Sequence, residues 1–117
     1  MRTHRDLLAW RRAQRLTIEV HRYAALQWKP AWSAIFDQLK RAALSVQLNI
    51  AEGFASGPGA RCRYHLRIAY GSAVETTELI ELLETLGGPD IAAVRQMSGT
   101  SREAQALTLL LWKRSRR

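Results

Sequence analysis

The chain has 117 residues, of which 47% are hydrophobic and 24% are charged. It is therefore long enough for one domain with a substantial core and too apolar for an intrinsically disordered protein. Eighteen Lys and Arg residues against ten Asp and Glu residues give a formal net charge of +8. A small domain this basic most often contacts a polyanion, either nucleic acid or an anionic membrane surface, and the alternative is a charge that only maintains solubility.

The cysteine content and the length of the apolar runs further restrict the class of protein to which this chain can belong. A single cysteine, Cys62, excludes a disulfide framework within one chain and a multi-cysteine zinc site, and fits a reducing compartment. Arg11 and Arg12 occur before any continuous apolar run of signal-peptide length, and no apolar run, 109–112 included, is long enough to span a bilayer. We therefore expect a soluble cytoplasmic protein with no signal peptide and no membrane partner.

Proline and glycine fall in three groups, which divide the chain into four helix-forming segments. The groups are Pro30, residues 57–59 and residues 87–89. The predicted helices span residues 5–26, 33–55, 60–86 and 90–114. Short connections between them predict an all-α fold, an up-and-down antiparallel four-helix bundle that forms one domain over residues 1–117. The basic tail, 113–117, is expected to be flexible.

The first predicted helix separates an apolar stripe from a row of guanidinium groups. At about 100° per residue, the apolar stripe consists of Trp10, Ala13, Thr17, Val20 and Ala24. The basic row on the opposite face consists of Arg11, Arg15 and Arg22, with Arg12 beside it. This row is either an ordinary solvated face or a surface that contacts phosphates, and its pattern alone favours neither.

The second predicted helix carries a polar row between two apolar ones. The polar row consists of Gln38, Arg41, Ser45, Asn49 and Glu52, at spacings of three or four residues. On one side it is bordered by a core stripe of Ile35, Leu39, Ala42, Val46 and Ile50, and on the other by Leu44 and Leu48. The row is therefore either a buried hydrogen-bonded network or a subunit contact, because buried polar groups must be paired.

In the third predicted helix, a carboxylate lies in the middle of the predicted inner face. That face consists of Ile68, Ser72, Leu79, Leu82 and Leu86, with Glu75 among them. A hairpin about Pro58 would place Arg41 and Glu75, each seventeen residues from the turn, at the same level. We therefore predict an Arg41–Glu75 ion pair, which would fix register more than it adds stability. The predicted structural polar network around it consists of Arg41, Ser45, Asn49, Glu52, Ser72 and Glu75.

The fourth predicted helix is interrupted by a Ser-Gly-Thr-Ser segment at residues 98–101. Glycine inside a helix costs about 1 kcal/mol relative to alanine. We expect either a kink there or a new helix capped by Ser98 or Thr100. The chain then ends in the densest cationic run of the sequence, which contains Lys113, Arg114, Arg116 and Arg117.

Common catalytic and metal-binding patterns are missing from the sequence. A di-metal carboxylate bundle uses Glu-x-x-His on two helices, and no His follows a Glu by three residues here. The three histidines lie apart, and Cys62 between Arg61 and Arg63 is more simply explained as a spectator thiol. No phosphate-binding loop follows the glycines at 57 and 59. We therefore expect a protein that is not an enzyme and has no metal and no cofactor.

Two strings of the sequence resemble a known family. Residues 41–54 read RAALSVQLNIAEGF and residues 68–75 read IAYGSAVE, and the opening residues 6–10 are also alike. They resemble the bacterial four-helix-bundle family encoded by intervening sequences in large-subunit ribosomal RNA genes, to which the accessory variability determinant of diversity-generating retroelements is similar. The likeness covers residues 6 to about 88.

The resemblance implies a ring-like homopentamer with a basic surface. It also implies nucleic-acid binding and, in retroelement members, association with a reverse transcriptase. We expect a non-enzymatic oligomer that binds the backbone of RNA or DNA, as an accessory to a reverse transcriptase or to ribosomal RNA. The expected phosphate contacts are Arg11, Arg12, Arg15, Arg22, Lys113, Arg114, Arg116 and Arg117. The alternative is a protein-interaction scaffold of this family with no direct nucleic-acid role.

Overall fold

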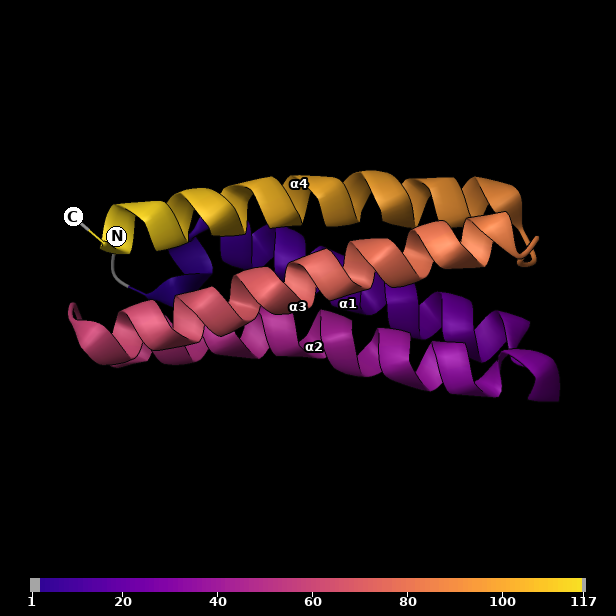
Figure 1. Cartoon of the computed structure of the whole chain (residues 1–117), viewed down its shortest axis with the longest axis horizontal. Helices are drawn as coiled ribbons and strands as arrows, with labels where there is room; N and C mark the ends of the chain where they lie inside the picture. The colour runs from indigo at the N-terminus through magenta and orange to yellow at the C-terminus, as the bar shows by residue number, and fades with distance from the viewer. Residues whose placement is uncertain (1–2, 117) are drawn as a thin grey trace.

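The computed structural model describes residues 3–116, which form four long antiparallel helices (Figure 1). The helices are α1 (Leu8–Gln27), α2 (Ser33–Ala55), α3 (Ala60–Thr85) and α4 (Ile91–Ser115), with 3₁₀ turns η1 (His4–Asp6) and η2 (Pro30–Trp32) before α1 and α2. The bundle measures 43 × 21 × 20 Å. The predicted all-α four-helix fold is confirmed. No helix in the described part of the chain combines the length and apolarity that crossing a membrane requires.

Each helix packs against its two neighbours around the bundle, so that α4 closes the ring by lying against α1. Because the chain runs up and down, the start of α1, the α2–α3 turn and the end of α4 lie at the same end (Figure 1). The α1–α2 and α3–α4 connections lie at the other end. This topology brings together side chains that are far apart in the sequence.

The helix ends are set by local backbone chemistry. Gly87 has a φ of 76°, and the N–H of Gly88 donates to the carbonyl of Leu83 at 2.9 Å, which closes α3 in a Schellman motif. Asp90 caps α4, because its carboxylate accepts from the N–H of Ala93 at 3.2 Å. At the α2–α3 turn, Gly57 and Gly59 have φ values of 72° and 137°. Only glycine adopts such angles without strain.

The predicted apolar stripes of α1 and α2 do face the core. Ala13, Val20, Leu39, Val46 and Ile50 are fully buried. Trp10 is also buried and packs in the half of the core that lies towards the α2–α3 turn, as expected. The other half of the core includes Phe36. These stripes are long and regular, which is why their periodicity was sufficient to orient both helices.

The predicted inner face of α3 is only partly correct, because Leu79 packs against the core and Ser72 bonds to Ser45 of α2, but other members lie outside. The buried side chains of α3 are Leu66, Ala69, Ala73, Thr76, Thr77, Ile80 and Leu83. Leu82 and Leu86, which we expected inside, are 47% and 57% exposed. Leu66, Ile80 and Leu83 are buried together with the small residues Ala69 and Ala73, so large apolar side chains occur on both faces of α3 and hydrophobicity alone does not identify the inner one.

The predicted break in α4 is wrong, because one α-helix runs through residues 98–101 (Figure 1). Thr100 and Ser101 are buried inside it. The Thr100 hydroxyl donates to the carbonyl of Gln96 at 3.2 Å, and the Ser101 hydroxyl lies 2.8 Å from that of Thr77 on α3. The polar segment therefore bonds α4 to α3 instead of ending the helix.

Replacing Gly99 by alanine is expected to raise the free energy of unfolding by about 0.5–1 kcal/mol, because the residue is helical and a Cβ there meets nothing within 4 Å. Urea unfolding followed by circular dichroism measures the change. Gly53→Ala is the control, because its Cβ would lie only 3.3 Å from the Cys62 carbonyl and from His65 Cβ. A gain for Gly53→Ala, or a loss for Gly99→Ala, would contradict this account.

Candidate functional site

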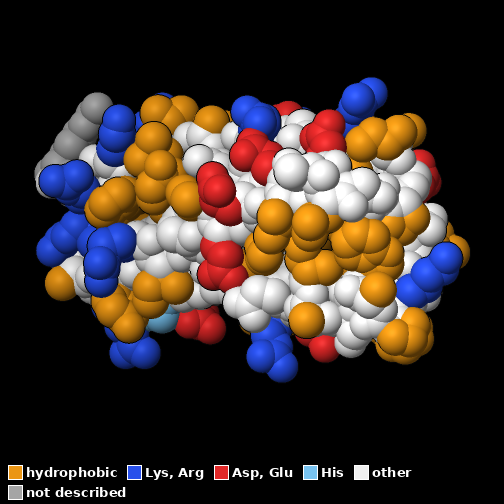
Figure 2. Space-filling model, turned by 45° about the vertical axis from the view of Figure 1, so that its right-hand side comes forward, with side chains coloured by type: hydrophobic (Ala, Val, Ile, Leu, Met, Phe, Trp, Pro, Cys, Tyr) orange, Lys and Arg blue, Asp and Glu red, His pale blue; other side chains and the backbone are white. Residues whose placement is uncertain are grey.

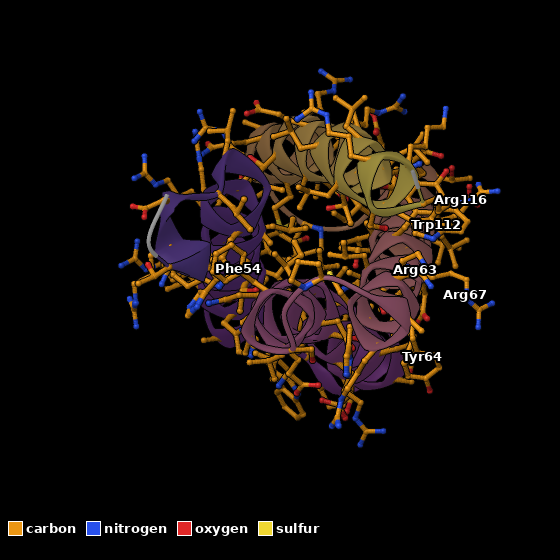
Figure 3. All side chains as sticks on the ribbon, turned by 90° about the vertical axis from the view of Figure 1, so that its left-hand side faces the viewer. Phe54, Arg63, Tyr64, Arg67, Trp112 and Arg116 are labelled. Carbon is orange, nitrogen blue, oxygen red and sulfur yellow. The ribbon has the colours of Figure 1, made fainter. Side chains whose placement is uncertain are left out.

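Cationic side chains from three helices gather at the end of the bundle that contains the α2–α3 turn. We call this group the basic end, and it consists of Arg5, Arg11, Arg61, Arg63, Arg67, Lys113, Arg114 and Arg116. Arg5 and Arg11 come from the start of the chain, the next three from the first turns of α3, and the last three from the end of α4. Figure 3 looks onto this end, and Figure 2 shows Lys and Arg side chains clustered over it.

The cations that α3 and α4 contribute to the basic end are not paired with carboxylates of the described residues. All eight side chains belong to exposed residues, and none of the six on α3 and α4 forms an ion pair within residues 3–116. Two of the guanidinium groups lie over aromatic rings. Arg5 Cζ is 5.3 Å from the ring centroid of Trp10, and Arg116 Cζ is 5.3 Å from that of Trp112. Such contacts orient a cation and leave its charge in place.

Aromatic side chains lie between these cations. Trp112 stacks on Tyr70 across the α3–α4 boundary, with ring centroids 5.8 Å apart and planes at 24°. Tyr64 on α3 is 54% exposed. Its ring makes an edge contact with the ring of His65, with the two ring centroids 5.5 Å apart and the two ring planes at 76°. Figure 3 shows Tyr64 projecting away from the bundle on the same helix as Arg67.

A shallow apolar hollow of about 590 Å³ opens between the α2–α3 turn and the end of α4. Phe54, Cys62 and the turn 57–59 form much of its wall, and Arg114 stands at its rim. Burial raises the pKa of the Cys62 thiol, and the neighbouring Arg63 partly opposes this shift. Among the described residues, no group of three or more His, Cys, Asp or Glu side chains could hold a metal ion.

The basic row predicted on α1 is divided by the structure. Arg11 joins the basic end, but Arg12 forms an ion pair with Glu103 of α4, and Arg15 Nε lies 3.3 Å from Glu19 Oε2. Arg22 lies towards the opposite end of α1, beside Asp90 and Gln96 at the start of α4. The predicted phosphate contacts therefore do not form one continuous surface.

The cationic run at the end of the sequence was expected to be a flexible tail, but most of it is helical. Lys113 and Arg114 lie in the last turn of α4, and Arg116 caps it, so the described part of the predicted flexible tail continues the helix. Arg117 lies outside the described residues. Sequence reasoning missed Arg5, Arg61, Arg63 and Arg67. The Gly-Pro-Gly turn could have indicated the three arginines of α3, because this turn places the first turns of α3 at the same end of the bundle as the end of α4.

The predicted Arg41–Glu75 ion pair is absent from the described residues. The Glu75 carboxylate accepts from the side-chain amide of Gln38 at 2.7 Å. Arg41 is exposed and lies beside His21 and Asp37 on the outer surface of α1 and α2. Both residues are exposed, but Arg41 lies on the side of α2 towards His21 of α1 and Gln38 on the side towards α3, so the amide and not the guanidinium reaches Glu75.

The rest of the predicted polar row does join α2 to α3. The hydroxyls of Ser45 and Ser72 are 2.8 Å apart, and the Asn49 amide donates to the Ser45 carbonyl at 2.9 Å. His65 Nδ1 lies 3.0 Å from the Asn49 amide oxygen and 3.3 Å from Glu52 Oε2. We call these five residues the α2–α3 lock. It extends from the middle of the two helices, at Ser45 and Ser72, to His65 near the basic end.

The half of α3 that lies away from the basic end has the opposite charge. Glu75, Glu78, Glu81 and Glu84 follow one another along α3. Glu81 pairs with Arg102, and Glu84 Oε1 lies 3.5 Å from Arg95 Nε. Figure 2 shows acidic side chains between the basic end and an apolar area on the other half of the molecule. The net positive charge is thus concentrated at one end.

Comparison with known protein families gives a match over most of the chain. The matching family is described as 23S rRNA-intervening sequence protein, and its model matches residues 5–109. This range includes all of α1, α2 and α3 and most of α4. No curated protein matches the sequence.

The Cys62 thiol is expected to react with iodoacetamide several-fold more slowly than glutathione at about pH 8, because its raised pKa reduces the reactive thiolate. Mass spectrometry of the intact protein over time measures the rate. The urea-unfolded chain is the control and should react at the rate of a free thiol. A folded chain that reacts as fast as glutathione would contradict the effect of burial.

Proposed function

Because the chain belongs to the family of 23S rRNA-intervening sequence proteins, we propose that it is a non-enzymatic, oligomeric protein that binds the backbone of RNA or DNA. The observation that supports this function best is the basic end, where exposed cations from α1, α3 and α4 lie together and those of α3 and α4 form no ion pair within the described residues. A set of fixed positive charges on a surface about 20 Å across matches the repeated charges of a phosphate backbone.

The composition of the basic end favours phosphates over isolated carboxylates. Seven of its eight members are arginines, with Lys113 as the exception. The planar guanidinium group presents several donors in a fixed geometry and binds phosphate oxygens with two parallel hydrogen bonds. Neutralising phosphates releases counterions, so affinity would fall steeply as salt increases.

The charge of the remaining surface restricts where the ligand lies. A duplex lying along the 43 Å axis would bring its phosphates against the carboxylates of α3. Arg95 and Arg102, which could offset them, are already paired with Glu84 and Glu81. The ligand therefore contacts the end of the bundle and does not run along its side.

A second candidate function is a protein-interaction scaffold, with a reverse transcriptase among the possible partners, and one observation favours a protein contact. Leu44 and Leu48 on α2 are 40% and 47% exposed, one helical turn apart. Leu82 and Leu86 form a similar pair on the neighbouring α3. Soluble proteins rarely leave large apolar areas uncovered. We propose that these outer leucines are covered in the homo-oligomer, for which the family resemblance implies a pentamer.

The double variant Arg63→Ala, Arg67→Ala is expected to weaken binding to a nucleic acid and to reduce the slope of log K against log salt by roughly 0.7–0.9 for each phosphate contact removed. Fluorescence anisotropy at several salt concentrations measures both quantities. The matched control, Arg22→Ala, Lys29→Ala, removes the same charge from exposed positions at the other end of the bundle. Equal effects of the two pairs, or affinity independent of salt, would contradict the proposal.

The double variant Leu44→Ser, Leu48→Ser is expected to lower the solution mass of the native assembly, because it removes apolar area that the oligomer would cover. Light scattering coupled to size-exclusion chromatography measures the mass. The control is Leu26→Ser, which changes a side chain that is 82% exposed near the end of α1. A monomeric wild-type protein would overturn the oligomer, and an unchanged mass would overturn the role of these leucines.

A further inference from the structure

Tyr64 is an aromatic side chain with no structural task in the described chain. More than half of its surface is exposed, and its ring makes one aromatic contact, an edge contact with His65. No hydrogen bond within residues 3–116 involves its hydroxyl group. A large ring on the solvent side of a helix adds little to folding, which leaves its flat face available to a ligand.

The surroundings of Tyr64 are cationic. Arg61 and Arg67 lie three residues before and after it, so both are its neighbours on the surface of α3. Both arginines are exposed and neither forms an ion pair within the described residues. A ring flanked on both sides by free guanidinium groups matches the repeating unit of a single strand, in which each base is connected to its neighbours through phosphates.

The other ring at this face of the basic end is already engaged. Trp112 stacks on Tyr70, and Arg116 lies over its ring. A base could stack on Trp112 only after displacing one of these partners. Tyr64 is therefore the ring that can stack on a base without rearrangement.

A duplex cannot use this ring. The faces of paired bases are covered by the bases above and below, so a protein ring can stack only on a base that is unpaired or at an end. The apolar hollow beside Phe54 offers a second place for an unpaired base, with Arg114 at its rim. Both features suit a strand whose bases are free.

We propose that the basic end is a site for single-stranded nucleic acid, in which Tyr64 stacks on one base while Arg61 and Arg67 bind the flanking phosphates. This inference rests on the proposed function and specifies the form of its ligand. RNA and DNA strands both present this combination of base face and phosphates, so both are expected to bind.

The test compares three RNA probes of about 12 nucleotides, within the usual range of single-strand sites. The first is an unstructured strand, the second is the same strand paired with its complement, and the third is the strand with abasic positions, which keeps every phosphate. Wild-type protein is expected to bind the unstructured strand at least about fivefold more tightly than either of the others, because each stacked base contributes about 1–3 kcal/mol.

Variants of Tyr64 assign the effect to the ring. Tyr64→Ala is expected to lose the preference for the intact strand over the abasic strand, and Tyr64→Phe is expected to keep it, because phenylalanine retains the ring. Arg67→Ala should weaken binding of intact and abasic strands equally. The matched control is Trp28→Ala, since Trp28 is also 54% exposed but lies at the other end of the bundle.

The two proposals fail separately in this experiment. If the duplex binds as tightly as the single strand and Tyr64→Ala changes neither, the single-strand site is overturned and the proposed phosphate binding stands. If Trp28→Ala has the same effect as Tyr64→Ala, the assignment to the basic end is overturned. If no probe binds at low salt, the proposed function and this inference are both overturned.

Discussion

The close packing of α2 against α3 is the constraint on which the rest of the structure depends. At Gly53 any side chain would crowd the Cys62 carbonyl and His65, each of which would lie 3.3 Å from an added Cβ. The α2–α3 lock then fixes the register of the two helices through hydrogen bonds between side chains. The turn between α2 and α3 is only a few residues long. The register of the two helices therefore fixes the position of the first turns of α3, and it places their arginines beside the end of α4.

The separation of charge follows from that packing. Free cations collect at one end because three helix termini rich in Lys and Arg meet there. Along the middle of α3 and α4 the opposite charges pair, as Glu81 does with Arg102. Exposed ion pairs of this kind contribute little stability, about 0–1 kcal/mol each. Their larger effect is to cancel positive charge away from the basic end, which leaves the net charge of the surface uneven.

The fold was predictable from the sequence to within a few residues at each helix end, because the Gly and Pro groups mark the turns and α1 and α2 have regular apolar stripes. The inner face of α3 was not, because leucines lie on both sides of the helix, Leu66 and Leu83 inside and Leu82 and Leu86 outside, and the buried residues also include Ala73 and Thr76. A ranking by hydrophobicity cannot choose between these leucines, because burial also depends on how closely the helices approach one another. The candidate site was recognised in part, since Arg11 and the end of α4 were expected, whereas the arginines of α3 acquire their importance only from the turn. α4 continues through Gly99, and Ser101 in this segment contacts Thr77 of α3, which no local pattern reveals.

The lock and the proposed single-strand site meet in two consecutive residues of α3. His65 points inwards to the Asn49 amide, and its ring also touches Tyr64, which points outwards. Since successive residues of a helix lie about 100° apart, fixing His65 also fixes the direction of the backbone that carries Tyr64. The exposed ring therefore stands on a helical turn whose orientation is set by the contact between His65 and Asn49. The same hydrogen bonds that set the register of the bundle thus prepare the surface on which an unpaired base would bind.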